Sequence, residues 1–147
     1  MTLKIATTTL SSAVALMVVI LSLLYSNTLN ARSSAWFEHD HGSVRLIAAR
    51  STVGDDDTIN LGLQFRMNSG WKIYWRSPGA AGFPPELDLA GSSNIAGYNM
   101  AWPVPERFSV LNMETLGYKK EVVFPITAML FESGKLAYIH MRVRFLT

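Results

Sequence analysis

Few side chains in this sequence are spaced so that they could perform chemistry together. In "EHDH", His39 and His41 alternate and would share one face of a strand, and imidazole is a common metal ligand. A histidine pair without further ligands is more often solvated, so we expect no metal site there. "GDDD", Asp55 to Asp57, lacks the spaced ligands and the bidentate glutamate of a calcium loop, which favours a solvated turn.

Covalent catalysis has even less support. The 147 residues contain no cysteine, so thiol, disulfide and cysteine-ligated metal chemistry cannot occur within them. No Gly-x-Ser-x-Gly motif is present, and no serine, histidine and acid are placed by their spacing as a nucleophile set. We therefore expect no catalytic residue and no cofactor in this chain.

An aromatic segment followed by a loop rich in proline and glycine is the most unusual stretch, "WKIYWRSPGAAGFPP" at 71–85. Alternation places Trp71, Ile73 and Trp75 on one face of a strand and Tyr74 on the other. The residues expected to shape the loop are Pro78, Gly79, Gly82, Pro84 and Pro85. Two interpretations stay open, a core strand that ends in a rigid loop and an exposed aromatic surface for a partner.

The remaining pattern predicts an all-β protein. Residues 43–50, 58–67, 121–131 and 136–145 alternate between apolar and polar positions, and no 3.6-residue period follows residue 36. The turn "ESGK" at 132–135 predicts that the last two runs form a β-hairpin, and Pro125 predicts an edge strand or a bulge. Short strands separated by turns favour an immunoglobulin-like two-sheet sandwich.

The N-terminal region predicts export. An uncharged apolar run, "AVALMVVILSLLY", precedes the small residues of "NARSSA", as in a signal peptide over 1–35 that is cleaved before Trp36 or after Ala31. An uncleaved anchor in the inner membrane is the alternative. The segment holds Lys4 and Arg32 and no acid, so the 13 basic and 11 acidic residues of the chain leave residues 36–147 balanced. A balanced charge gives nucleic acid no basic surface to bind.

Three spaced motifs carry a family resemblance, "GW..YW..PG..G.PP", then "WP.P.RF", then "GY..EVVFP". In this order they resemble the N-terminal periplasmic domain of the DsbD/ScsB thiol:disulfide interchange proteins, a protein-disulfide reductase family. The residues that carry the resemblance are Gly70, Trp71, Tyr74, Trp75, Pro78, Gly79, Gly82, Pro84, Pro85, Trp102, Pro103, Pro105, Gly117, Tyr118, Glu121, Val122 and Pro125.

The resemblance implies an immunoglobulin-like domain over 36–147 in the periplasm. In the family, such a domain takes reducing equivalents from a membrane-embedded domain and passes them to periplasmic disulfide proteins and to cytochrome c maturation. That exchange needs a cysteine pair, which the family pattern places just after a strand resembling "YIHMRVRFLT". Since this chain has no cysteine, we expect a sandwich that is incomplete at its C-terminus, truncated before the pair and non-catalytic by itself.

The expected role is therefore the scaffold and partner-docking part of such a reductase. The docking candidates are Tyr74, Phe83, Trp102 and Tyr118, and a structural role for all four is the alternative. The expected partners are periplasmic disulfide-exchange proteins or the remainder of the reductase. A free-standing exported module that binds a protein or peptide is the competing function.

Overall fold

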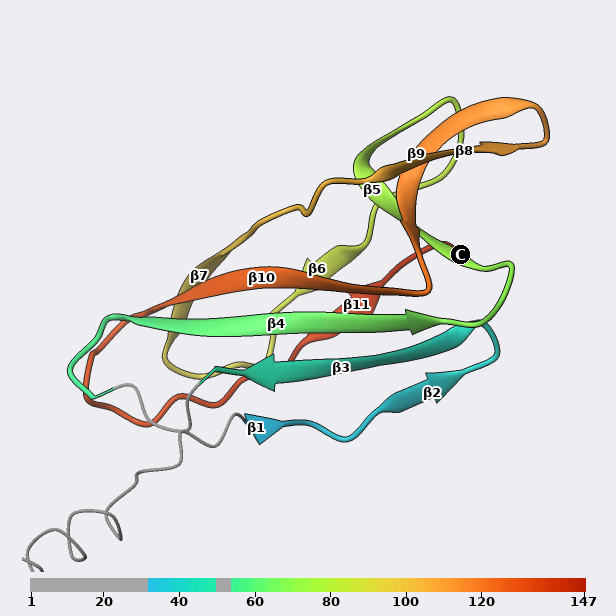
Figure 1. Cartoon of the computed structure of the whole chain (residues 1–147). Helices are drawn as coiled ribbons and strands as arrows, with labels where there is room; N and C mark the ends of the chain where they lie inside the picture. The colour runs from blue at the N-terminus through green and yellow to red at the C-terminus, as the bar shows by residue number, and fades with distance from the viewer. Residues whose placement is uncertain (1–31, 50–53) are drawn as a thin grey trace, which may run out of the picture.

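The computed structural model describes residues 32–49 and 54–147, and every regular element in these ranges is a β-strand (Figure 1). The expected all-β class is confirmed, while the predicted signal helix lies outside the described residues. The strands are β1 Arg32–Ser33, β2 Phe37–His39, β3 Gly42–Ala48, β4 Thr58–Met67, β5 Lys72–Gly79, β6 Glu86–Asp88, β7 Ile95–Met100, β8 Glu106–Val110, β9 Met113–Lys119, β10 Glu121–Leu130 and β11 Arg142–Arg144.

The strands form three antiparallel sheets that are consistent with an immunoglobulin-like sandwich. The largest sheet has the order β1-β3-β4-β10-β7, and β2 also pairs with β3. A two-stranded sheet, β11-β6, lies across the core from it (Figure 1). The third sheet, β5-β9-β8, stands at one end of the molecule and lies beyond the ends of β4 and β10.

Strands β4 and β10 form the centre of the large sheet and pair continuously from Glu121 with Arg66 to Met129 with Thr58. Burial alternates along β10 as the sequence predicts, because successive side chains point to opposite faces. The inward residues of the two strands are Leu61, Leu63, Phe65, Val122, Phe124, Ile126 and Ala128. Their burial is the main stabilising contribution, at about 25 cal/mol per Å² of apolar surface.

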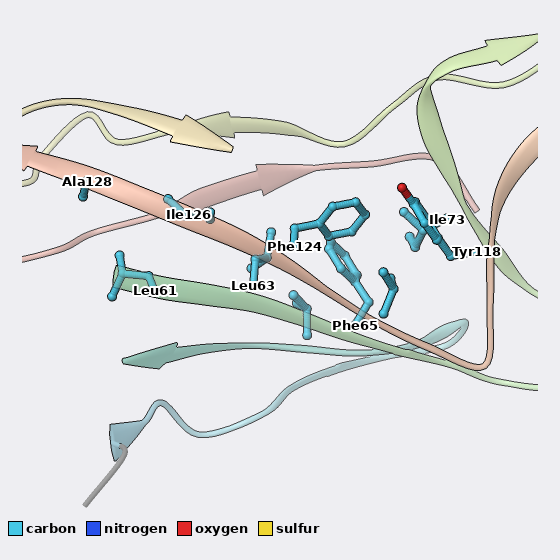
Figure 2. Packing of buried hydrophobic residues seen from close by; sticks show 10 residues of the cluster. Leu61, Leu63, Phe65, Ile73, Tyr118, Phe124, Ile126 and Ala128 are labelled. Atoms are coloured by element: carbon cyan, nitrogen blue, oxygen red, sulfur yellow. The ribbon is translucent and has the colours of Figure 1, made fainter. Parts of the chain in front are cut away.

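Phe124 is the aromatic centre of the core (Figure 2). Its ring meets those of Phe65, Trp102 and Tyr118 edge to face, with centroids 5.8, 5.2 and 5.2 Å away. Edge-to-face pairs add attraction to the burial of apolar area. Because Tyr118 comes from β9 and Ile73 from β5, these contacts join the third sheet to the core.

The expected edge position of Pro125 is wrong, because β10 is a central strand between β4 and β7. Pairing with β7 begins one residue later, at Ile126 with Met100, and the amide of Ala101 donates to the Pro125 carbonyl over 2.8 Å. The nitrogen of a strand residue points to the same side as its carbonyl. Pro125 therefore lacks its donor on the side where β7 has already ended, and the ladder loses little.

The expected hairpin between the last two runs is also wrong. β10 pairs with β4 and β7, whereas β11 pairs with β6 in the other layer. After the turn at 132–135 the chain crosses the sandwich, and Ile139, Met141, Val143 and Phe145 pack against the core from the opposite side. The alternation of these residues was predicted, but they pack against the core from the second layer of the sandwich.

The large sheet begins before the predicted domain boundary at Trp36. Arg32 and Ser33 pair with Ala48 and Ile47, and the amide of Ser34 donates to the Leu46 carbonyl over 2.8 Å. None of the described residues forms a helix long and apolar enough to cross a membrane.

Candidate partner-docking site

The loop at 80–85 is held against β9 where it leaves β5. Strand β5 pairs with β9 from Lys72 to Tyr74, the register then breaks, and pairing returns at Gly79 with Thr115. Gly79 has a φ of 96°, and a Cβ there would come within 2.7 Å of the Glu114 carbonyl oxygen. The amide of Ala80 donates to the same oxygen over 3.1 Å. Only glycine permits this approach without strain.

Gly82 brings the loop directly onto Tyr74. Its φ is 99°, and an added Cβ would overlap the Tyr74 ring. The loop therefore covers Tyr74, which is only 6% exposed and also lies beside the Phe108 ring at 6.2 Å. A buried ring can shape a docking surface from below, but its exposed area is too small to supply the contact itself.

Phe83 is in the opposite situation, because its side chain is 71% exposed. The two prolines that follow are half-buried at Pro84 and buried at Pro85, so the chain on one side of Phe83 is fixed. Gly82, against Tyr74, fixes the other side. An exposed aromatic residue is thereby presented on a constrained backbone.

Trp102 and Tyr118 belong mainly to the interior. Trp102 is half-buried and packs against Phe124, and Tyr118 is 5% exposed. The Tyr118 hydroxyl donates a hydrogen bond of 2.7 Å to the Pro103 carbonyl. Burial raises the pKa of Tyr118 to about 12, against the smaller and opposite effect of the Arg76 guanidinium. The four predicted residues thus do not form one exposed cluster, and of the four Phe83 presents by far the most exposed side chain.

The other two aromatic residues named in segment 71–85, Trp71 and Trp75, also differ in exposure. Trp75 packs against the core, whereas Trp71 is 37% exposed and stacks on His41 with centroids 3.4 Å apart. His41 also hydrogen-bonds Thr147 through Nδ1 over 2.6 Å, and the His39 ring stacks on that of Phe145. In the part of the chain that the structure describes, no three histidine, cysteine or acidic residues gather as a metal site.

The structure adds two exposed apolar residues that the sequence did not single out. Val104, before β8, and Leu111, at the turn between β8 and β9, are almost fully exposed. Leu111 and Asn112 have φ values of 49° and 65°, as in the tight type I′ turns of β-hairpins. The sequence signal was weak, since such turns favour asparagine followed by glycine, and here leucine takes the first position.

Comparison with known proteins matches the sequence to a family and the fold to a solved structure. Residues 43–147 match the family described as "Thiol:disulfide interchange protein DsbD, N-terminal". The fold is similar to the crystal structure of the N-terminal periplasmic domain of ScsB from Proteus mirabilis, with 27% sequence identity and a TM-score of 0.60. That match covers 78% of this chain and 50% of the ScsB chain, so the likeness extends over half of that structure. No curated protein sequence matches the chain.

Proposed function

Because the chain belongs to the family of DsbD N-terminal domains of thiol:disulfide interchange proteins, we propose that it is the scaffold and partner-docking part of a periplasmic reductase domain. The match from residue 43 to residue 147 is the observation that carries this proposal. Its location follows from the similar ScsB domain, which is periplasmic. Its partners are periplasmic disulfide-exchange proteins, including those of cytochrome c maturation, or the remaining parts of such a reductase.

We assign the thiol–disulfide exchange step to residues other than these 147. Exchange requires a thiolate that attacks a disulfide sulfur, and these 147 residues contain no cysteine. The chain therefore contributes a surface, and the cysteine pair that transfers electrons comes from other residues. An insulin-reduction assay with the chain alone is expected to show only the rate of the dithiol reagent.

Phe83 is the side chain proposed to make the central docking contact. Aromatic anchors that are already fixed before binding lose little conformational freedom when a partner arrives. The Gly82 contact with Tyr74 and the buried Pro85 supply that restraint on either side. Exposure of Phe83 without this restraint would be much weaker support for a docking contact.

The proposal is tested by titrating the full chain with a purified periplasmic disulfide isomerase and following backbone amide shifts by NMR. We expect saturable shifts centred on 80–85, and a Phe83→Ala variant that binds about tenfold more weakly, as for an interface anchor. Leu136→Ala is the matched control, since Leu136 is 93% exposed and lies outside the loop. Equal affinity for both variants would remove Phe83 from the docking surface.

The competing function, a free-standing exported module that binds a protein or peptide, predicts a different result. Its ligand would bind at 80–85 without any relation to disulfide exchange. Titration with the isomerase would then give no saturable shifts, and a photo-crosslinker at Phe83 would capture no cysteine-bearing envelope protein. The family match favours the reductase role over this alternative.

A further inference from the structure

Three lysines gather at a pocket that the docking proposal does not use. The pocket has a volume of about 440 Å³ and lies where β4 turns into β5 and β9 turns into β10. The residues that line it are Met67, Asn68, Ser69, Gly70, Trp71, Lys72, Lys119 and Lys120. The two turns are joined by the Met67 amide, which donates to the Lys120 carbonyl over 2.7 Å.

Two of the lysines are placed directly opposite each other. Lys72 of β5 and Lys119 of β9 are cross-strand partners, and both ammonium groups lie over the Phe108 ring, at 5.0 and 5.2 Å from its centroid. Like charges in directly opposed positions destabilise a sheet, although the aromatic face attracts each of them. A local arrangement that opposes folding is expected mainly where function requires it.

Lys120 adds a third charge on strained backbone. Its φ of 63° lies in the left-handed region, which residues other than glycine, asparagine and aspartate rarely occupy. This conformation turns the chain from β9 into β10 and leaves Lys120 exposed at the pocket.

Nearby acids compensate these charges only in part. Glu106 approaches Lys119 with an Nζ–Oε2 distance of 4.0 Å, and within the described ranges Lys72 and Lys120 have no ion pair. Glu121, next in sequence, accepts instead from Gln64 and from Arg66. The pocket therefore has a surplus of positive charge, and the partly exposed Trp71 is among its lining residues.

We propose that this pocket binds a phosphate group. Three lysines line the pocket, and their ammonium groups are separate point charges that suit an anion with its charge spread over several oxygens. Lys72 and Lys119 would bring theirs to the anion by turning from the Phe108 ring, which is not among the lining residues. Lysine is a common phosphate-binding residue in proteins and acts there as a point charge. The phosphate belongs to a soluble compound or to a lipid headgroup. This inference does not depend on the proposed reductase role.

The test uses the full chain, with inorganic phosphate as the probe and sodium chloride at equal ionic strength as the reference. We expect saturable NMR shifts at 67–72 and 119–120 with phosphate alone. A Lys72→Gln and Lys120→Gln double variant should bind about tenfold more weakly, the effect of removing two charge-assisted contacts that are partly open to solvent. Lys135→Gln, which changes an exposed lysine of the 132–135 turn, is the control.

A second arm identifies the source of the phosphate. Flotation compares phosphatidylcholine vesicles with vesicles in which part of that lipid is replaced by phosphatidylglycerol. Since the apolar N-terminal run could itself bind bilayers, the measured quantity is the increase caused by phosphatidylglycerol in the parent chain and in the double variant. An increase that the double variant loses assigns a headgroup, and phosphate shifts without it assign a soluble compound. The proposal is wrong if phosphate produces no saturable shifts and the double variant keeps whatever flotation increase phosphatidylglycerol causes in the parent chain.

Discussion

The β4–β10 pair and the β5–β9 pair are built in opposite ways. β4 and β10 pair without interruption from Glu121 to Met129, and most of their inward side chains are buried. β5 and β9 pair over three residues, break, and meet again at Gly79, and they set Lys72 opposite Lys119. The first pair is organised for stability, whereas the second accepts irregular backbone and opposed charges. The two recognition sites that we propose both lie on the second pair, although Ile73 and Tyr118 of that pair also belong to the core.

The largest effect is expected from breaking the first region at its centre. Phe124→Ala should lower the free energy of unfolding by about 3–5 kcal/mol, because it leaves a cavity among Phe65, Trp102 and Tyr118. Urea denaturation followed by circular dichroism measures the change. Val123→Ala, one residue away on the exposed face, should cost less than about 1 kcal/mol. Comparable losses for the two variants would contradict the assignment of Phe124 to the core.

A smaller effect is expected from the loop of the second region. Gly82→Ala should lower the free energy of unfolding by about 2–4 kcal/mol, since alanine meets both the left-handed backbone and the Tyr74 ring. Gly54→Ala shares the positive φ but has open space around it, and should lose only about 1 kcal/mol. Thermal unfolding of both variants separates the ring contact from the backbone term. Equal losses would mean that the loop does not rest on Tyr74.

The smallest effect concerns the hydroxyl of Tyr118, a residue of the second region whose ring packs on Phe124 of the first. Tyr118→Phe should cost about 1 kcal/mol at neutral pH, because it removes the hydrogen bond to the Pro103 carbonyl. Burial raises the pKa of Tyr118 to about 12, so the folded state favours the neutral phenol. The stability linked to this shift is complete below about pH 10, the ordinary pKa of tyrosine, and is lost as the pH rises towards 12.

Urea unfolding between pH 8 and 12 tests this linkage, with pH limits set by the two pKa values. The parent chain should lose stability over the upper part of that range more steeply than Tyr118→Phe. Tyr138→Phe, which changes an exposed tyrosine, should follow the parent. A parent and a Tyr118→Phe variant with parallel pH profiles would show that ionisation of Tyr118 is not linked to unfolding.

Alternation in the sequence was sufficient to predict which side chains of the first region face the core, though not the central position of β10 in its sheet. It was insufficient for the second region. Along β10 the period of two reports burial directly, because one face of the strand is covered by a continuous core, and β4 follows the same pattern apart from the buried Gln64. At Tyr74 the same reasoning left open whether the ring is buried or exposed. The loop that covers this ring comes from residues without any period, and alternation tells which side chains share a face but not what lies over that face.

Pairing between distant segments was the other limit. The hairpin predicted for 121–145 was wrong because a turn between two runs does not show whether the second run stays in the same sheet. The lysine pocket was missed for a similar reason. "YKKE" suggests only a solvated turn, and its relation to Lys72 exists only through the β5–β9 register. The family motifs partly compensated for this limit. Their order was sufficient to identify the domain, and the match over 43–147 confirms it.

The short strand β1 lies at the point where the two predicted cleavage positions differ. Arg32 and Ser33 cover part of the outer edge of β3, and an uncovered edge strand is a template for pairing with another molecule. A peptidase that cut after Ala31 would leave this cover in place, whereas a cut before Trp36 would remove it. The two predicted cleavage positions would therefore leave different lengths of the β3 edge open to strand exchange or aggregation.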